Sequence, residues 1–277
     1  MRVLRELGEA TEAVRLAHRA GGTTGLVPTM GALHRGHESL IRQSLLGCDH
    51  TFVSIFVNPT QFGPGEDLDR YPRTLQDDLG LCESLGVRGV FVPTADAMYP
   101  AGATTTIDPP DVATSLEGER RPGHFAGVCT VVMKLFQILP TTAAFFGKKD
   151  YQQLAVIAAM VRDLNLPVRV LGGETVRDPD SLALSSRNRY LSEEQRRTAL
   201  AIPRTLNDVS TRWRTGHRDF AALEGSMAEP LDALEVEYAV IRDAETLDRP
   251  VAGRTAVALI AARVGETRLI DNVELFD

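Results

Sequence analysis

Apolar residues along the first 175 positions follow two alternating patterns. Short runs that are almost continuously apolar or β-branched are typical of strands buried on both faces of a parallel sheet. These runs are 23–30, 51–59, 88–93, 143–147 and 167–173. The segments between them carry apolar residues three or four positions apart, as one face of a helix requires. These segments are 38–45, 73–86, 125–139 and 151–164. The alternation predicts an α/β fold built on a parallel sheet with right-handed crossovers.

The pattern changes from about residue 188 onward. A charged helical stretch covers 192–206, and strand-like segments follow at 235–243 and 255–264. We therefore expect a smaller C-terminal α+β domain after the α/β domain. The expected boundaries are 1–175 and 188–277, with 176–187 as the hinge.

Composition narrows the class of protein. Hydrophobic residues make up 43% of the 277 positions and charged residues 24%, and no apolar run approaches the ~20 residues that a membrane span needs. The first 22 residues mix acidic and basic side chains in a helical pattern and lack the apolar core and cleavage site of a signal peptide. We therefore expect a cytoplasmic protein without a membrane segment.

Charge and cysteine usage limit the partners. A formal net charge of −7 argues against binding a nucleic acid backbone through bulk electrostatics, although a local basic site for a small anion is compatible with it. Cys48, Cys82 and Cys129 are isolated and odd in number, so they indicate neither a disulfide framework nor a zinc site. Small molecules are the expected partners.

Polar residues and glycines gather at four predicted strand ends. The segments are "PTMGALHRGH" (28–37), "NPTQFG" (58–63), "FGKKDYQQ" (146–153) and "LALSSRN" (182–188). Ligands of parallel α/β sheets bind outside the carboxyl ends of the strands. Because all four segments are expected at such ends, together they favour a nucleotide site.

His34 and His37 straddle a predicted helix start. A helix begins with unpaired N–H groups and a partial positive charge, which favour an anion such as phosphate. Two imidazoles beside that end would add hydrogen-bond donors. The alternative is that the pair caps the helix or packs, and this stretch alone leaves both open.

The last two segments offer charge and hydroxyl groups. Asp150 can cap a helix or accept hydrogen bonds from ribose hydroxyls, and Lys149 offers a charge for phosphate. Ser185, Ser186 and Arg187 supply two hydroxyls and a planar guanidinium that match polyphosphate oxygens. Taken singly, segment 146–153 also fits a solvated lysine pair with a helix cap. Segment 182–188 alone also fits a simple turn.

The chain closely resembles the pantothenate synthetase family of the nucleotidyltransferase superfamily. The resemblance runs nearly end to end and includes "LVPTMGALHRGH", "VSIFVNPTQFG", "DLDRYPRT", "RPGHFAGVCTVV", "KDYQQL", "LALSSRNRYL" and "TRLIDN". The His-x-Gly-His element marks only the superfamily, whereas its combination with "NPTQF" and "KDYQQ" is highly specific. The resemblance implies a Rossmann-like sheet domain, a smaller C-terminal domain that closes over the site, and a homodimer.

The resemblance also implies the reaction. Pantoate would attack the α-phosphorus of ATP, pyrophosphate would leave, and β-alanine would attack the pantoyl adenylate to give pantothenate and AMP. His37 matches the proton donor, and His34, Lys149 and Arg187 match the other catalytic positions. The implied ATP contacts are Met30, Gly31, Ala32, Leu33, His34, Arg35, Gly36, His37, Gly147, Lys148, Lys149, Asp150, Val176, Leu184, Ser185, Ser186 and Arg187. The hinge, 176–187, would thus also be the phosphate-binding loop.

Gln61 and Gln153 match the pantoate-binding positions. An amide offers donors and an acceptor to a hydroxy acid without adding charge beside the reacting carboxylate. The polyphosphate implies Mg²⁺, and Asp77 and Asp78 match a family acidic pair that would bind it; a solvated helix face is the alternative. Arg121 and His124 are candidates for a substrate loop, with helix capping as the alternative for His124.

Two residues near the implied site depart from the family pattern. Lys148 stands where glutamate is usual, and Ser181 where glycine is common before "LALSSRN". Lys148 pointing to solvent would be neutral, and pointing inward it would affect ATP binding or Lys149. Ser181 would restrict the loop if its backbone needs a positive φ.

Three other functions compete with this interpretation. One is a different adenylyl-transferring enzyme of the same superfamily, against which only Gln61, Gln153 and their neighbours argue. Another is a nucleotide-binding module without turnover, which would need a broken set of phosphate-binding residues. The third is a class I tRNA synthetase core, which the acidic charge and the lack of an anticodon-binding extension disfavour.

Overall fold

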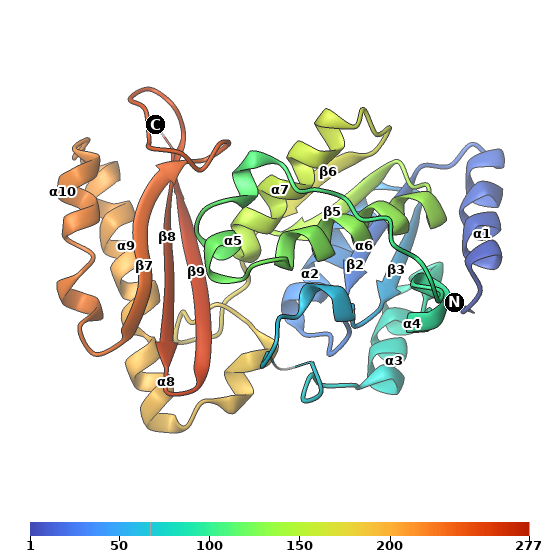
Figure 1. Cartoon of the computed structure of the whole chain (residues 1–277), viewed down its shortest axis with the longest axis horizontal. Coiled ribbons are helices and arrows are strands. Elements are labelled where there is room, and N and C mark those ends of the chain that lie inside the picture. Colours follow the sequence, from blue (N-terminus) through green and yellow to red (C-terminus); the bar gives the residue numbers. More distant parts are fainter. Residues whose placement is uncertain (67, 277) are drawn as a thin grey trace. The chain divides into compact units, whose positions relative to one another are not determined.

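The computed structural model describes residues 1–66 and 68–276. The chain folds into two compact units (Figure 1). The first comprises Met1–Lys148 and Val156–Glu174, and the second comprises Lys149–Ala155 and Thr175–Asp277. The second unit thus takes a short piece from the middle of the chain in addition to the C-terminal part.

The first unit is built on a six-stranded parallel sheet in the order β1-β4-β3-β2-β5-β6. Its strands are β1 (Arg2–Leu4), β2 (Thr24–Thr29), β3 (His50–Ile55), β4 (Gly89–Phe91), β5 (Ala143–Gly147) and β6 (Arg169–Gly173). Nearly every residue of the central strands β2, β3 and β5 is buried, because helices cover both faces of the sheet. Val27, Val53 and Phe145 are among the core residues on these strands.

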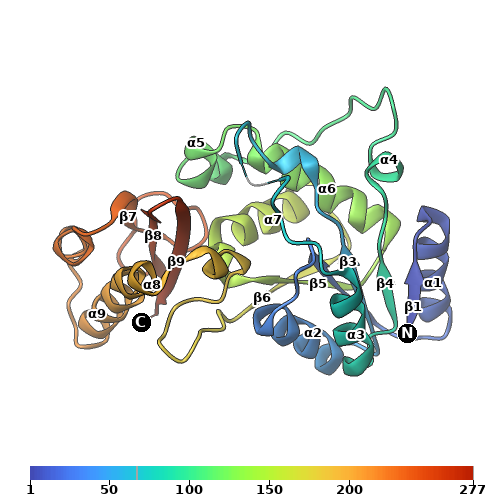
Figure 2. The same ribbon diagram turned by 90° about the horizontal axis from the view of Figure 1, so that it is seen from below.

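Helices follow the strands as the alternating pattern predicted. They are α1 (Leu7–Arg19), α2 (Arg35–Gly47), α3 (Leu75–Leu85), α4 (Ala95–Met98), α5 (Glu117–Arg120), α6 (His124–Ile138) and α7 (Tyr151–Asp163). Figure 2 shows α2 and α3 on one side of the sheet and α6 on the other. Ile41 of α2 and Cys82 of α3 are fully buried in the core that these helices form with the sheet.

The chain begins differently from the expectation of a single helical segment. Residues Arg2–Leu4 form the edge strand β1, which pairs with β4, and α1 starts only at Leu7. A strand of three residues is too short to show a period of two, so its pairing with β4 could not be recognised in the sequence.

The second unit contains a three-stranded antiparallel sheet in the order β7-β8-β9. Its elements are β7 (Glu235–Asp243), β8 (Ala256–Val264), β9 (Thr267–Leu275), α8 (Glu193–Ala199), α9 (Ala201–Arg214) and α10 (Phe220–Gly225). The charged stretch 192–206 is divided between α8 and α9, and Ser192 and Gln195 form a capping box at the start of α8. Strand β9 was not predicted from its hydrophobic pattern.

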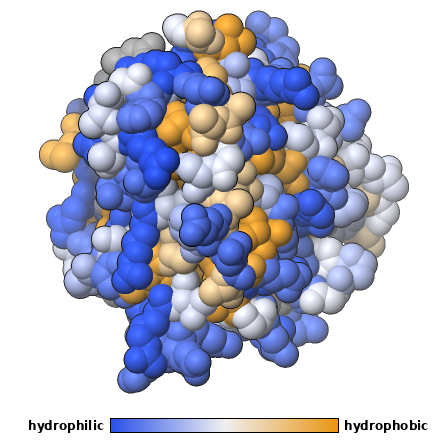
Figure 3. Space-filling view, turned by 90° about the vertical axis from the view of Figure 1, so that its left-hand side faces the viewer, coloured by the Kyte–Doolittle hydropathy of each residue, from blue (hydrophilic) through white to orange (hydrophobic). Residues whose placement is uncertain are grey.

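The helices of the second unit pack on its sheet around a separate apolar core. Trp213 of α9 is 3% exposed and stacks on Phe220 with ring centroids 5.3 Å apart, so it is part of this core. Figure 3 faces the side of α10 and β7 and shows hydrophobic residues in small groups separated by hydrophilic ones. The predicted fold class, an α/β domain on a parallel sheet followed by a smaller α+β domain, is confirmed.

Helices in the described part of the chain are all too short or too polar to cross a lipid bilayer.

Candidate active site

The turn between β2 and α2 has an unusual backbone. Gly31 has φ 84° and Ala32 has φ 51°, so two consecutive residues lie in the left-handed region. A Cβ atom on Gly31 would also come within 3.1 Å of Oδ2 of Asp78 and 3.2 Å of the side chain of Ile55. Glycine at this position therefore satisfies both the backbone angle and the space.

Asp78 holds this turn from the first turn of α3. Its side chain is 3% exposed, Oδ2 accepts the N–H of Ala32 at 3.0 Å, and Oδ1 accepts the N–H of Leu33 at 2.8 Å. Thr74 also donates its hydroxyl to Oδ1 at 3.2 Å. Both carboxylate oxygens thus satisfy backbone groups that the left-handed turn leaves without helical partners.

The acidic pair expected to bind a metal is split between two environments. Asp77 is exposed at the surface of α3, whereas Asp78 is buried against the turn. The described residues contain no group of three or more His, Cys, Asp or Glu side chains arranged to hold a metal ion. The metal-binding role of Asp77 and Asp78 stays a prediction.

His34 and His37 cap the start of α2 reciprocally. His34 is the N-cap residue, its Nδ1 accepts the N–H of Gly36 at 3.2 Å, and its own N–H is donated to Nδ1 of His37 at 3.3 Å. The two rings lie 4.1 Å apart between centroids. A Cβ on Gly36 would come within 2.9 Å of the His34 ring, so the close approach of the ring requires glycine.

This capping fixes the tautomer of both rings. A ring nitrogen that accepts an N–H carries no proton, so each neutral imidazole has its proton on Nε2. Each ring then caps through Nδ1 and has Nε2–H as its donor. Helix capping and binding of an anion, which the sequence left as alternatives, are therefore compatible in the same two side chains.

Gln61 ends the 3₁₀ turn η1 (Pro59–Gln61) after β3. Its Oε1 accepts an N–H of Asn58 at 3.1 Å, and its Nε2 lies 3.1 Å from Sδ of Met30. The contact with Met30 brings together two of the segments predicted at strand ends, 28–37 and 58–63.

Asn58 sets the orientation of the Gln61 amide. Its Oδ1 accepts the hydroxyl of Tyr99 at 2.9 Å and that of Thr60 at 3.0 Å, so its Nδ2 is the donor to Gln61 and to the carbonyl of Gly127. Gln61 therefore uses its oxygen and one N–H inside the protein, the latter toward Sδ of Met30, and its second N–H is the remaining donor of the amide. Asn58 is 1% exposed, and sequence analysis gave it no role beyond ending a strand.

Arg121 and His124 lie on the other side of Gln61. Nδ1 of His124 is 2.8 Å from the backbone oxygen of Gln61, and Nη1 of Arg121 is 3.0 Å from Nε2 of His124. Glu66 receives two hydrogen bonds of 2.7 Å from Arg121. Burial and the nearby Arg121 charge lower the pKa of His124 to about 4.

The segment after β5 carries residues of both units. Gly147 ends β5 and Lys148 follows it in the first unit, whereas Lys149, Asp150 and Gln153 belong to the second. Lys148 forms an ion pair of 2.7 Å with Glu174. Lys148, one of the two residues that depart from the family pattern, is thus paired with a carboxylate of its own unit.

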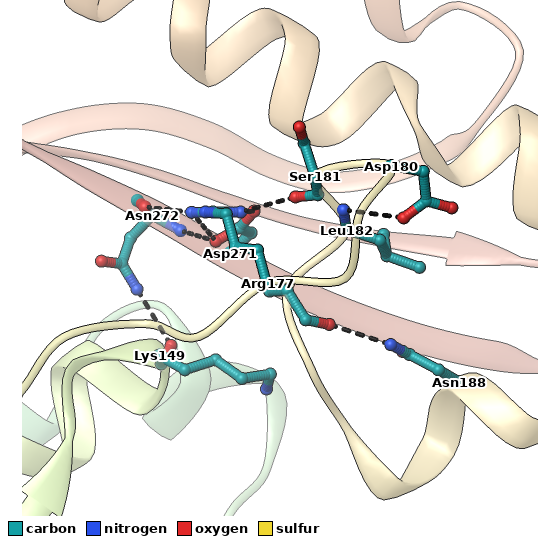
Figure 4. A network of polar contacts seen from close by, with 9 residues as sticks. Lys149, Arg177, Asp180, Ser181, Leu182, Asn188, Asp271 and Asn272 are labelled. Atoms are coloured by element: carbon teal, nitrogen blue, oxygen red, sulfur yellow. Dashed lines mark hydrogen bonds and ion pairs between the residues drawn. The ribbon is translucent and has the colours of Figure 1, made fainter. Parts of the chain in front are cut away.

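A polar network in the second unit holds the backbone of Lys149 (Figure 4). Asn272 of β9 donates its Nδ2 to the oxygen of Lys149 at 2.9 Å, and its own N–H is donated to Asp271 at 2.8 Å. The side chain of Asp271 is 3% exposed and forms a two-pronged ion pair of 2.6 and 3.0 Å with Arg177. The Lys149 side chain lies 3.5 Å from Oδ1 of Asp150.

The same network extends to the segment 182–188, which contains Ser185 and Ser186. Arg177 donates to the oxygen of Ser181 at 3.1 Å, and the N–H of Leu184 is donated to Val176 at 2.9 Å. Ser185 caps the 3₁₀ turn η4 (Ser186–Tyr190) by accepting the N–H of Arg187 at 3.3 Å. Within the second unit, the predicted ATP contacts at 149–150, 176 and 184–187 are thus connected through Arg177 and β9.

Asp271 and Asn272 are functional candidates that sequence analysis missed. Both are buried, at 4% and 6% exposure, although neighbouring residues on a strand point to opposite faces. Two adjacent polar residues inside an otherwise strand-like segment were the available signal, and without a predicted β9 they had no place in the fold.

Ser181 has φ 76°, which is the positive value that the sequence analysis considered for this loop. A non-glycine residue in that region carries backbone strain. Its oxygen accepts from Arg177 and its N–H is donated to Asp178 at 2.8 Å, so the tight turn persists despite the side chain.

A parallel sheet with a His-x-Gly-His turn at the start of a helix places the chain in the class of nucleotidyltransferase-like α/β enzymes. A family model described as pantoate-beta-alanine ligase matches residues 2–274. The chain belongs to the pantoate-beta-alanine ligase family.

Individual relatives agree over nearly the whole length. A pantothenate synthetase of Rhodopirellula baltica is 56% identical over 263 residues, which are 93% of each chain. The crystal structure of the enzyme from Thermus thermophilus matches 100% of both chains with a TM-score of 0.92 and 43% identity. A pantoate-beta-alanine ligase from Francisella tularensis, described as complexed with beta-gamma ATP and beta-alanine, matches 99% of this chain and 97% of its own with a TM-score of 0.79 and 33% identity.

Proposed function

We propose that this chain condenses pantoate with β-alanine at the expense of ATP, through a pantoyl adenylate, and releases AMP and pyrophosphate. Membership of the pantoate-beta-alanine ligase family supports the overall reaction. The observation that carries the site assignment is the reciprocal capping of His34 and His37, since it puts the proton of each neutral ring on Nε2 at the start of a helix.

Activation of the acid explains why such donors are needed. A carboxylate is a poor electrophile, so an amine does not form an amide with it in water until adenylation supplies a leaving group. The first step, attack on the α-phosphorus, spreads negative charge over phosphate oxygens. Preorganised donors lower that barrier because they need no rearrangement as the charge develops. In this proposal, His37 and His34 donate to those oxygens, with the N-terminal end of α2 adding its partial charge.

The other ATP contacts in this proposal come from both units, and those of the second unit include Lys149, Asp150, Val176 and 184–187. Lys149 and Arg187 bind phosphate as a point charge and as a fork, and the hydroxyls of Ser185 and Ser186 add donors. Gly147, Asp150 and the backbone of Val176 hold adenosine. The remaining proposed ATP contacts are Met30, Gly31, Ala32, Leu33, Arg35, Gly36, Lys148 and Leu184.

Gln61 and Gln153 are the proposed pantoate contacts. The orientation of Gln61 supports its role, because its oxygen accepts from Asn58 and one N–H is donated to Met30, so the second N–H is the donor proposed for a carboxylate or hydroxyl of the acid. A neutral donor holds the acid without opposing the charge that its carboxylate must bring to phosphorus.

The residues that the structure describes do not form a protein cage for Mg²⁺. The described part lacks a suitable group of ligands, and both oxygens of Asp78 bind backbone N–H groups. We therefore propose that Mg²⁺ arrives bound to the ATP oxygens, as a hard cation with few protein ligands can. A homodimer is proposed on the family resemblance alone. A cytoplasmic location is proposed on the composition and sequence pattern from which the sequence analysis expected it.

The test is AMP release from ATP and β-alanine with and without pantoate. We expect release only when pantoate is present. Equal release without pantoate, or release with another acid instead, would contradict the proposal and favour a different adenylyl-transferring enzyme. Binding of ATP without any release would favour the module without turnover.

A further inference from the structure

We propose that His124 is a positioning residue for pantoate: as the neutral Nδ1–H tautomer it holds the backbone carbonyl of Gln61 and so fixes the amide that binds the acid. This inference rests on the pantoate-binding role proposed for Gln61. It assigns a role to a side chain that lies in the "RPGHF" segment, 63 positions along the chain from its partner.

The tautomer follows from the donors around the ring. Nη1 of Arg121 lies 3.0 Å from Nε2 of His124, and a guanidinium has only N–H donors. Nε2 must therefore accept, which leaves the proton of the neutral ring on Nδ1. That nitrogen lies 2.8 Å from the oxygen of Gln61, the right distance for an N–H···O hydrogen bond.

Arg121 is itself held in place. Glu66 receives hydrogen bonds of 2.7 Å from both Nε and Nη2 of Arg121, a bidentate arrangement that fixes the plane of the guanidinium. The side chains of Arg121 and Glu66 are only 17% and 26% exposed. These contacts form a continuous hydrogen-bond network in which each donor meets an acceptor. It runs from Glu66 through Arg121 and His124 to Gln61.

The position of His124 distinguishes this role from helix capping. It is the first residue of α6, and Gly123, with φ 82°, is the N-cap. The His124 ring contacts a carbonyl of η1 rather than serving as the N-cap side chain. Its ring is 5.0 Å from that of Phe125, and the residue is 8% exposed, so it is held within the protein.

Gln61 is consequently fixed at both ends. His124 donates to its backbone oxygen at 2.8 Å, with Nη2 of Arg121 as a second, longer donor at 3.4 Å, and Asn58 donates to its side-chain oxygen at 3.1 Å. Helix α6 also packs tightly on η1, because a Cβ on Gly127 would come within 2.2 Å of the oxygen of Thr60. A three-residue turn that is anchored this way holds the Gln61 amide, which also donates to Sδ of Met30, in one orientation, as a preorganised contact for the acid requires.

The activity test compares two substitutions at His124. His124→Asn can place an amide N–H where Nδ1–H was, whereas His124→Leu cannot donate. We expect His124→Leu to raise the KM for pantoate about tenfold while the KM for ATP changes less than about twofold, and His124→Asn to recover most of the loss. A matched control is His217→Leu, an exposed histidine of the second unit, which should leave both values unchanged.

The second readout does not depend on activity. The imidazole ¹⁵N shifts of the intact protein at pH 7 should show His124 protonated on Nδ1 and unprotonated on Nε2, with His124→Asn identifying the signal. An Nε2–H tautomer, or an unchanged pantoate KM in a cooperatively folding His124→Leu variant, would overturn the inference. Equal rises in the KM for pantoate and the KM for ATP would also overturn the inference, since they would indicate a general disturbance of the structure rather than a specific effect on Gln61.

Gln61→Ala separates this inference from the proposed function. If it leaves the pantoate KM unchanged, the pantoate role of Gln61 fails, and this inference fails with it. If it raises that KM while His124→Leu does not, only the inference about His124 is wrong.

Discussion

Oδ1 of Asp78 accepts the N–H of Leu33 at 2.8 Å, and this contact ties the first turn of α3 to the loop that carries the two histidines. Asp78→Asn retains a single acceptor oxygen, so one of the two backbone N–H groups of the loop loses its partner. We expect a loss of about 1–3 kcal/mol in the free energy of unfolding and a lower kcat, because His34 follows the loop directly. Urea unfolding and steady-state kinetics measure both.

Asp77→Asn is the matched control. Its side chain is exposed on the same turn, so the stability should change by less than about 0.5 kcal/mol. If instead both substitutions raise the Mg²⁺ concentration needed for half-maximal rate, Asp77 and Asp78 bind the metal and the anchoring role of Asp78 is incomplete.

Substitution of His37 should separate helix capping from chemistry. Glutamine at the third position of a helix can accept the N–H of the N-cap residue, as His37 does for His34. We expect His37→Gln to unfold within about 0.5 kcal/mol of the parent but to lose about a hundredfold or more of pantoate-dependent pyrophosphate exchange, since an amide that caps the helix in place of Nδ1 has no donor at the position of Nε2–H. His37→Ala should lose exchange to a similar extent and about 1 kcal/mol of stability as well. Retained exchange in either variant contradicts the proposed role of His37.

His124 should make stability fall in mild acid. Its pKa is about 4 in the folded protein against 6.5 ordinarily, so between these values the unfolded state binds a proton that the folded state does not. Stability is therefore lost as the pH falls from about 7 towards 4, by about 2 kcal/mol already at pH 5. Arg121, Glu66 and Glu117 are the charged groups that act on the ring.

The measurement is urea unfolding at pH 7 and pH 5 for the parent and His124→Asn. Burial acts to raise the pKa of Glu66, but Arg121 outweighs it and holds the pKa below its usual value. A carboxyl group of lowered pKa stabilises above its unfolded pKa and loses this stabilisation as the pH falls through the folded value, which lies below the window used here. The parent should thus lose more stability than His124→Asn, and equal losses would show that His124 is not the cause.

Ser181→Gly should stabilise the protein. At φ 76° a serine carries strain that glycine does not, and its two backbone hydrogen bonds are unaffected by loss of the side chain. We expect a gain of up to about 1 kcal/mol, reduced by the greater entropy of glycine in the unfolded chain. Ser84→Gly, in the exposed part of α3, should instead cost about 0.5 kcal/mol, and thermal unfolding compares the two signs. A loss of stability at both positions would mean that Ser181 does not carry the backbone strain inferred from its φ.

Asn272→Ala should weaken ATP binding more than pantoate binding. The substitution removes the donor that meets the oxygen of Lys149 at 2.9 Å, and with it the link between β9 and a proposed phosphate contact. We expect the KM for ATP to rise about fivefold to tenfold at a nearly constant KM for pantoate, as loss of one buried hydrogen bond predicts. Asn207→Ala, exposed on α9, is the control that should leave both unchanged. A rise confined to pantoate would show that Asn272 does not act through the nucleotide.

The parallel sheet was predictable because its central strands are buried on both faces. Such strands consist of nearly continuous apolar residues, which can be recognised in the sequence. The strand ends and their polar segments followed from the same runs. Edge strand β1, with three residues, and β9, with its buried Asp271 and Asn272, do not carry a comparable pattern. Local periodicity therefore revealed the centre of the first sheet better than the margins of either sheet.

The partners of the site residues were less accessible to sequence reasoning. Asp78 contacts Leu33 across 45 positions, His124 contacts Gln61 across 63, and Asn272 contacts Lys149 across 123. Such separations leave no spacing signal, since they depend on how strands and helices pack. Residue types alone could suggest a ligand for Asp78 or a cap for His124, but only the fold shows which atoms they meet.

The second unit includes Lys149–Ala155, so its sequence is not contiguous. Tyr151 illustrates the dependence: its hydroxyl is 3.1 Å from the oxygen of Ala244 and 3.2 Å from Glu274. A gene fragment that stops at Glu174 would encode Tyr151 without these neighbours, and one that starts at Thr175 would lack Tyr151 altogether. No single cut in the coding sequence separates the two units intact. A crossover between relatives just before Lys149 keeps the second unit whole and divides the first, whereas one just after Glu174 does the opposite.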